Sequence, residues 1–354
     1  MLEHGGKLIQ AARQYRIPID QWLDLSTGLN PHAWPASDVP ADIWARLPEE
    51  DDGLIPAARD YYGGKQLLAV AGSQAAIQAL PRLRDPASHI AILHPAYAEH
   101  AHAWRSNGFS VTPLSTASMD EIIETHDVIL LVNPNNPSGE CFSVEQCLCW
   151  HGRLRQRGGW LIVDEAFMDV TPEGSLVPHT PQEGLIVLRS LGKFFGLAGV
   201  RLGFVFAEAA LLSQLAELLG PWPISGPSRF IAKQALRDVS WQENMRGQLK
   251  HQGQRLQQLL TNYHLPPDGG CALFQWLKTT EAPIIHEQLA RQGILTRLLM
   301  DPVSLHFGRS QRPVSRDTCA SLRFGLPAGE QEWARLEQAL SSLTLHVTTG
   351  ETQP

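Results

Sequence analysis

The sequence predicts an α/β protein with a mostly parallel central sheet and a smaller second domain. Three observations indicate this class: short apolar runs recur along the chain, helical segments lie between them, and the pattern changes after about residue 240. The runs are continuous rather than alternating, which is typical of strands buried on both faces of a parallel sheet. Strands that alternate with helices form layered α/β domains. A chain of 354 residues can hold one large and one small domain.

Six apolar runs are the expected strands of the large sheet, and each ends at glycine, proline or polar residues. They cover residues 67–70, 90–93, 128–132, 160–163, 185–188 and 203–206. Helical segments are expected between several of them. One begins at Ser143, where Gln146 completes a capping-box pattern, and stops at Gly158 and Gly159.

The chain beyond residue 240 is expected to form the smaller domain. A long amphipathic helix, which could link the two domains, is marked by the stripe Met245, Leu249, Leu256 and Leu260. Short apolar segments follow at 272–277 and 321–324. The expected division is an N-terminal segment that packs with the small domain and the active site, a large cofactor-binding domain, a small domain and a frayed tail, at residues 1–40, 41–240, 241–347 and 348–354.

Charge and cysteine usage exclude several classes of protein. The net charge of -7 argues against nucleic acid or an anionic membrane surface as the main partner. The first residues lack the pattern of a signal peptide, and no apolar run reaches the ~18 residues that a membrane-spanning helix needs. Five cysteines without a Cys-x-x-Cys pair indicate neither a disulfide framework nor a metal site. We therefore expect a cytoplasmic protein without membrane insertion.

The segment from Ser190 to Gly203 predicts a reactive lysine beside a phosphate group. Lys193 has glycines on either side, Ser190 three residues before it and Arg201 eight residues after it. A lysine amine attacks a carbonyl only after losing its proton, which burial or nearby positive charge favours. Ser190 and Arg201 offer a hydroxyl and a fixed positive charge to a phosphate. The segment favours pyridoxal 5'-phosphate held as an imine by Lys193, and a lysine in a surface loop is the simpler alternative.

Three other segments strengthen this interpretation, although each is common by itself. Asp164 directly follows the run at 160–163, so its carboxylate is expected in the crevice where α/β folds bind ligands. An aspartate there keeps the pyridine nitrogen of the cofactor protonated. The turn-forming residues 133–139 follow another expected strand, and residues 71–77 pass from a strand through glycine into a helix start, where backbone N–H groups bind phosphate.

In this order, the four segments resemble the fold-type I, aspartate aminotransferase-like, pyridoxal-phosphate enzymes over most of the chain. Within that superfamily, the sequence is most similar to the L-threonine O-phosphate decarboxylase family of cobalamin biosynthesis, with histidinol-phosphate aminotransferases next. The decarboxylases are favoured by the His-Gly-Gly segment at His4, by the Ser-Thr-Gly-Leu-Asn segment that ends at Asn30, and by Phe167, where the aminotransferases usually have a tyrosine. The resemblance implies a fold-type I large domain and a smaller α+β domain.

The resemblance also implies roles for individual residues. Lys193 and Asp164 correspond to the catalytic imine lysine and the partner of the pyridine nitrogen. The other implied cofactor contacts are Ser73, Gln74, Tyr97, Asn136, Ser190 and Arg201. The implied substrate contacts are His4, Gly5, Asn30, Asn136, Arg309 and Arg323. In the family pattern Tyr97 stacks on the cofactor ring, Arg323 clamps the substrate carboxylate, and Arg309, fourteen residues before it, is the second substrate arginine.

The implied activity is decarboxylation of L-threonine O-phosphate, a small phosphorylated amino acid, to (R)-1-aminopropan-2-ol phosphate for the cobalamin side chain, by a homodimer. Two departures concern the cofactor phosphate: Leu47 replaces a tyrosine that reaches the neighbouring subunit, and Gly-Ser-Gln at 72–74 replaces Gly-Asn-Gly. An aminotransferase of the histidinol-phosphate type stays open as the alternative, because the bond that breaks depends on substrate orientation. A cofactor-binding regulator is disfavoured, since the motifs begin almost at residue 1.

Overall fold

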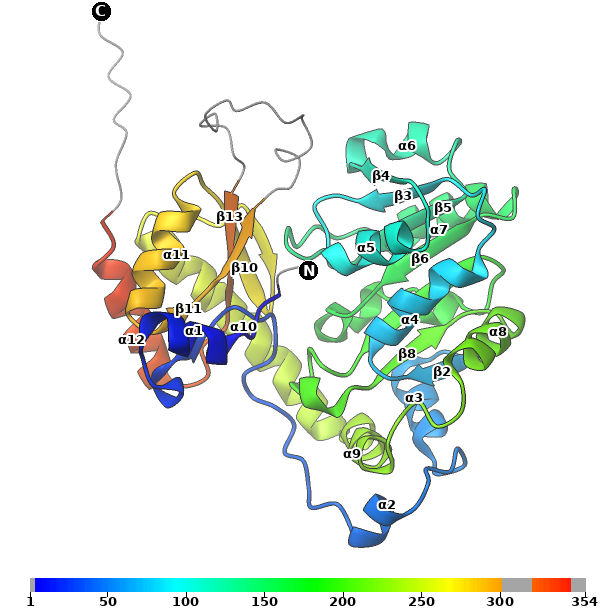
Figure 1. Cartoon of the computed structure of the whole chain (residues 1–354), viewed down its shortest axis with the longest axis horizontal. Helices are drawn as coiled ribbons and strands as arrows, with labels where there is room; N and C mark the ends of the chain where they lie inside the picture. Colours follow the sequence, from blue (N-terminus) through cyan, green and yellow to red (C-terminus); the bar gives the residue numbers. More distant parts are fainter. Residues whose placement is uncertain (1–3, 301–319, 345–354) are drawn as a thin grey trace, which may run out of the picture.

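The computed structural model describes residues 4–300 and 320–344 of the chain, which are built around two larger sheets and one two-stranded sheet (Figure 1). The larger sheet has seven strands in the order β2-β8-β7-β6-β5-β3-β4. Strand β8 runs antiparallel to both of its neighbours, and the other pairs are parallel. In chain order the strands are β2 (Leu67–Val70), β3 (Ile90–Leu93), β4 (Val111–Leu114), β5 (Val128–Val132), β6 (Trp160–Asp164), β7 (Leu185–Ser190) and β8 (Gly203–Phe206).

Both faces of the large sheet are covered by helices, and for this reason every residue of β3, β5, β7 and β8 is buried. One face packs against α4 (Ser73–Ala79), α5 (Ala98–Ser106) and α8 (Ala209–Leu219). The core on the other face includes side chains of α3 (Leu54–Tyr62), α7 (Val144–Arg155), α9 (Gly226–Arg237) and α10 (Val239–Asn262). Two short helices complete this part, α2 (Ala41–Ala45) and α6 (Met119–Ile122).

The six predicted strands are confirmed, and the bounds differ only where β6 extends to Asp164 and β7 to Ser190. The capping box at Ser143 is also confirmed, although the helix ends at Arg155. Strand β4 was not predicted. It lies at the edge of the sheet, is only partly buried and contains a proline, which edge strands tolerate.

The second sheet has four antiparallel strands in the order β12-β13-β10-β9. They are β9 (Gly269–Cys271), β10 (Phe274–Lys278), β12 (Arg297–Met300) and β13 (Ala320–Gly325). The helices of this part are α11 (Ala282–Arg291), α12 (Glu330–Ser341) and the long α10, whose predicted apolar stripe is buried. Helix α10 packs on β10 and also reaches the loop that follows β6, so it connects the two sheets.

The N-terminal residues pack with the second sheet rather than the first. Helix α1 (Leu8–Tyr15) lies against α11, and β1 (Leu23–Asp24) pairs in parallel with β11 (Ile294–Leu295). We keep the expected domain limits at residues 40, 240 and 347 as a proposal. Within the described residues, no helix combines the length and the apolar character that crossing a membrane requires.

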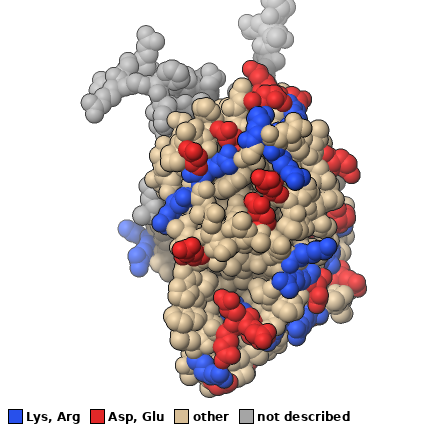
Figure 2. All heavy atoms as spheres, turned by 90° about the vertical axis from the view of Figure 1, so that its right-hand side faces the viewer, with Lys and Arg blue, Asp and Glu red and all other residues tan. Residues whose placement is uncertain are grey.

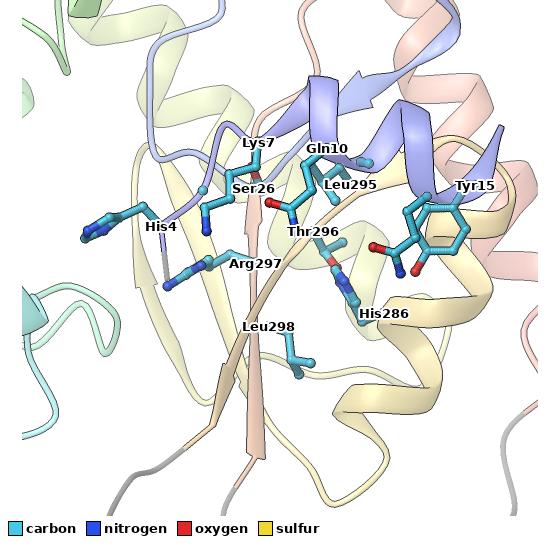
Figure 3. Close-up of a pocket in the computed structure, with 13 residues that line it drawn as sticks. His4, Lys7, Gln10, Tyr15, Ser26, His286, Leu295, Thr296, Arg297 and Leu298 are labelled. Carbon is cyan, nitrogen blue, oxygen red and sulfur yellow. The ribbon is translucent and has the colours of Figure 1, made fainter. Parts of the chain in front are cut away.

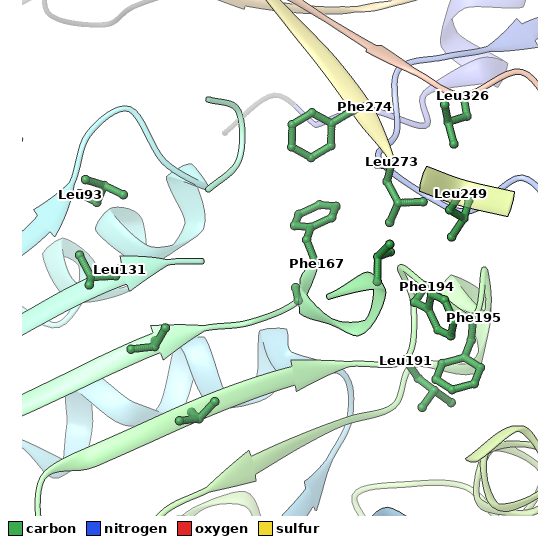
Figure 4. Close-up of a cluster of buried hydrophobic side chains, with 14 of the residues drawn as sticks. Leu93, Leu131, Phe167, Leu191, Phe194, Phe195, Leu249, Leu273, Phe274 and Leu326 are labelled. Carbon is green, nitrogen blue, oxygen red and sulfur yellow. The ribbon is translucent and has the colours of Figure 1, made fainter. Parts of the chain in front are cut away.

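The carboxyl ends of the central parallel strands point toward the second sheet (Figure 4). Phe167, in the turn after β6, and Phe274, at the start of β10, face each other across this boundary with ring centroids 5.1 Å apart. Gly28 lies beside both rings, and a Cβ atom there would come within about 3 Å of each. The two sheets therefore meet in an apolar wall next to the strand ends that carry the predicted chemistry.

Candidate active site

Asp164 is the last residue of β6, and its buried carboxylate is held by a histidine that the sequence interpretation missed. One oxygen, Oδ2, lies 2.8 Å from Nε2 of His100, and the other accepts the backbone N–H of Ala166 at 3.0 Å. His100 is itself buried, on the first turn of α5. Its ring meets the ring of Tyr97 nearly edge-on, with centroids 5.9 Å apart. The available signal was its position three residues after Tyr97, on one face of an expected helix.

Lys193 follows β7 and approaches the same edge of the sheet. Burial, reinforced by the positive charge of Arg323, lowers the pKa of Lys193 to about 8, although nearby Asp164 opposes the shift. Nζ lies 5.4 Å from the centre of the Phe167 ring. The backbone carbonyl of Lys193 accepts a hydrogen bond from the N–H of Asn30 at 3.0 Å. A fixed amine that loses its proton this easily can act as a nucleophile near neutral pH.

The residues predicted to bind the cofactor phosphate come together beside β8. Gly72 has φ +70°, and a Cβ atom there would lie 2.7 Å from Nη2 of Arg201. Gly203 pairs in register with Ser190, and a Cβ atom at Gly203 would lie 2.6 Å from the backbone N of Ser73. The antiparallel strand thus carries Arg201 against the start of α4. Glycine at both positions leaves room for this close approach.

The side chains of Gln74 and Ser190 are already engaged in the protein. Gln74 accepts a 3.4 Å hydrogen bond from the Tyr97 hydroxyl and donates through Nε2 to Glu99 at 2.8 Å. Ser190 Oγ accepts the N–H of Gly192 at 3.3 Å and keeps its own hydroxyl proton for a further acceptor. Burial, with the negative charge of Glu99, raises the pKa of Tyr97 to about 12, so this phenol stays neutral.

Arg323 reaches the site from β13 and contacts Asn136. Nη1 donates to Oδ1 of Asn136 at 2.6 Å, and Nη2 donates to the carbonyl of Ser26 at 2.9 Å. The side chain is buried, and no described residue accepts a hydrogen bond from its Nε. Burial and the neighbouring Arg297 lower the pKa of Arg323 to about 10, so the guanidinium is still charged at neutral pH. A buried cation of this kind is suited to an anionic ligand.

The N-terminal site residues occupy different places. His4 lies at the boundary between the two parts, with Nε2 2.7 Å from Oε1 of Glu99. Gly5 is pressed against the chain at Ser26, since a Cβ atom there would lie 2.3 Å from the Ser26 carbonyl oxygen. Asn30 is buried and uses its amide within the protein: it donates to the Phe194 carbonyl at 2.7 Å. It therefore holds the loop of Lys193 in place.

Arg309 lies outside the described residues, so its predicted substrate contact stays a prediction. A second arginine was missed: Arg297 on β12 is the direct cross-strand partner of Arg323. It lines a cavity of about 180 Å³ together with His4, Gly5 and Ser26 (Figure 3). In Figure 3 its side chain extends toward the same side as His4 and Lys7. The usable signal was an arginine two residues after the apolar run Ile294–Leu295, although only the pairing of β12 with β13 shows that it lies opposite Arg323.

Comparison with known proteins places this site in a family. The model of the family described as aminotransferase class I and II matches residues 54–312. The chain belongs to this family. A threonine-phosphate decarboxylase of Pseudomonas aeruginosa is 52% identical over 340 residues, which cover 96% of this chain and 97% of the relative. A threonine-phosphate decarboxylase of Sinorhizobium is 40% identical, over 83% of this chain and 89% of the relative. The predicted resemblance to the threonine-phosphate decarboxylases within the aminotransferase family is thereby confirmed.

Solved structures of the aminotransferase family share the fold. A histidinol-phosphate aminotransferase of Sinorhizobium meliloti, in complex with pyridoxal-5'-phosphate, superposes with a TM-score of 0.78 over 97% of this chain and 99% of that structure. Its sequence is only 18% identical, so this likeness concerns the fold alone. The predicted fold class is confirmed.

Proposed function

We propose that this chain is a pyridoxal-phosphate-dependent decarboxylase that converts L-threonine O-phosphate to (R)-1-aminopropan-2-ol phosphate for the cobalamin side chain. The observation that carries the proposal is the meeting of Lys193 and Asp164 at one sheet edge with the paired arginines Arg297 and Arg323 of the second sheet. The name and the 52% identity of the Pseudomonas aeruginosa relative support the same reaction.

The residues present fit pyridoxal phosphate. Asp164 offers a buried carboxylate, oriented by His100, to a protonated ring nitrogen. Arg201, Ser190 and the backbone at Ser73 offer donors to a phosphate. When bound, the cofactor supplies an electron sink for the electron pair of the bond that breaks. Lys193 supplies the amine that holds it, and its lowered pKa makes the deprotonated form accessible.

The chain's cations account for the two anionic ends of the substrate. Arg323 is proposed to hold the carboxylate, because its Nε has no acceptor among the described residues and its positive charge lies close enough to Lys193 to lower the pKa of that amine. Arg297 and His4 are proposed to meet the phosphate, and Arg309 is a further candidate for this role. Two fixed anchors set the angle of the bond between Cα and the carboxylate, and positioning of this kind can contribute ~7–11 kcal/mol to a rate. The apolar wall of Phe167 and Phe274 keeps water from one side of the reacting atoms.

Product analysis tests the proposal. The purified protein is mixed with pyridoxal phosphate and phosphothreonine, without a keto acid, and carbon dioxide and aminopropanol phosphate are measured. We expect both products in equal amounts. The alternative, an aminotransferase of the histidinol-phosphate type, would need a keto acid and would convert glutamate or histidinol phosphate. Turnover that depends on a keto acid would rule out the decarboxylase.

A homodimer in the cytoplasm completes the proposal. Trp44 in α2 and Leu47 just after it expose 68% and 66% of their surfaces, and a second copy of the chain would cover them. In Figure 1, α2 projects from the lower end of the molecule.

On the face shown in Figure 2, basic and acidic side chains lie intermixed. That face therefore offers no continuous basic surface to a nucleic acid.

A further inference from the structure

Glu99 is an acidic residue at the boundary between the two parts, and neither the sequence motifs nor the proposed reaction uses it. It lies in the first turn of α5, in the large part. Oε1 lies 2.7 Å from Nε2 of His4. Oε2 accepts Nε2 of Gln74 at 2.8 Å and Nε2 of Gln78 at 3.1 Å. Glu99 thus binds His4 and, at the same time, the residue that follows Ser73 at the proposed phosphate loop.

The His4 side of this contact belongs to the other part of the molecule. Residues 4–6 lead into α1, which packs on α11, and they are pinned to Ser26. The N–H of Gly6 donates to Ser26 Oγ at 2.7 Å, and Gly5 sits against the Ser26 carbonyl. That carbonyl also accepts Nη2 of Arg323. One chain of contacts therefore runs from the proposed carboxylate anchor, through residues 4–6, to the large part.

A carboxylate beside a site for a substrate with two anionic groups would repel that substrate unless hydrogen-bond donors of the protein offset its negative charge. Only 12% of the Glu99 side chain is exposed, and both oxygens are occupied by donors from opposite sides of the boundary. Hydrogen bonds to an ionised group are stronger than neutral ones. The arrangement fits a carboxylate whose task is to order its donors.

We propose that Glu99 is a positioning residue that holds the N-terminal segment, residues 4–6, across the mouth of the active site by binding His4 while ordering Gln74. The proposal rests on the proposed function, because the held segment carries a contact for the substrate phosphate. With Nε2–H donated to Glu99, the His4 ring has one orientation, in which the imidazolium form can also donate through Nδ1 to an anionic ligand. Binding of the phosphate ester, rather than the chemical step, should then depend on Glu99.

Hydrogen exchange in the holoenzyme tests the holding of the segment without reference to activity. In Glu99→Gln, one carboxylate oxygen becomes an NH₂ group, so the single oxygen that remains cannot accept from His4 and from Gln74 and Gln78 at the same time. We expect the peptide that begins at residue 4 and includes α1 to exchange roughly tenfold faster than in the wild type. The matched control is Glu121→Gln, an exposed glutamate in the first turn of α6, which should leave exchange unchanged. His4→Ala, which removes only a half-exposed side chain, should reproduce the effect.

Kinetics on the same variants test the link to the substrate. For Glu99→Gln we expect KM for phosphothreonine to rise roughly tenfold with little change in kcat and in the visible absorption of the bound cofactor. The double variant with His4→Ala should be no worse than the worse single variant, because both remove one contact. Unchanged exchange together with unchanged KM would overturn the proposal. Faster exchange in a protein that decarboxylates nothing would instead refute the proposed function and leave the holding role standing.

Discussion

At the residue scale, the site depends on how the protein treats a few ionisable groups. Lys193, Asp164 and Arg323 are conspicuous in the sequence because a lysine between glycines, an aspartate at a strand end and an arginine in an apolar run each need a reason. The residues that surround them in the fold have no comparable signal in the sequence. His100 and Glu99 look like ordinary helix residues, and only the fold brings His100 to Asp164 and Glu99 to His4.

The lowered pKa of Lys193 predicts how the apoprotein captures its cofactor. The amine attacks only when deprotonated, so the rate of pyridoxal-phosphate capture should rise with pH up to about 8 and then level off. With a lysine of ordinary pKa, near 10.4, the capture rate would instead keep rising up to about that pH. The measurement is the growth of visible absorption after apoprotein and cofactor are mixed across this pH range. Lys193→Ala should show no such growth, and a rate that still climbs above pH 9 would contradict the assignment.

The contact between Asp164 and His100 predicts graded effects of substitution. Asp164→Asn removes the charge that faces the ring nitrogen, and losing one partner of a buried charged pair costs about 3–5 kcal/mol. His100→Asn leaves the carboxylate in place but loosens it, at about 1–3 kcal/mol. Decarboxylation should therefore fall far more in Asp164→Asn than in His100→Asn, while both proteins still bind cofactor by absorption. Equal rates in Asp164→Asn and the wild type would remove Asp164 from this role.

At the scale of elements, the sequence predicted strands best where both faces are buried. The runs at 128–132 and 203–206 coincide with β5 and β8, because a strand of continuous apolar residues is stable only where both of its faces are buried. Elements that depend on partners far along the chain were missed. Strands β1 and β11 have two residues each and exist only through their pairing with each other. Strand β12 carries Arg297 and pairs with β13 across residues 301–319, so its register could not be read from local pattern.

The register of β12 and β13 predicts which arginine sets substrate preference. Arg297→Ala should lower kcat/KM for phosphothreonine by roughly tenfold to a hundredfold and affect plain threonine little, because only the phosphate loses its partner. Arg323→Ala should damage both substrates. The quantity to compare is the ratio of kcat/KM values for the two substrates in each variant. Arg309→Ala belongs in the same series: if it alone erodes the ratio, the phosphate anchor is Arg309 rather than Arg297.

At the scale of the whole molecule, exposed apolar residues predict self-association. Light scattering should give twice the 39.1 kDa mass of one chain. Leu47→Asp would place a charge in the covered surface and should weaken the dimer by roughly tenfold or more. Ile284→Asp, at a 42% exposed position on α11, is the matched control and should stay dimeric. A fully active monomer would defeat this expectation.

The packing of α1 and β1 against elements far along the chain, α11 and β11, also constrains how the protein is made. Helix α1 and β1 leave the ribosome well before their partners α11 and β11, which are synthesised about 270 residues later. The last strand of the large sheet ends at Phe206, so this sheet can begin to form before the partners of α1 and β1 are synthesised. During translation the apolar side of α1 is therefore exposed, and a nascent-chain chaperone that binds apolar segments would bind α1. The half of the site that grips the substrate is assembled only after translation has passed β13.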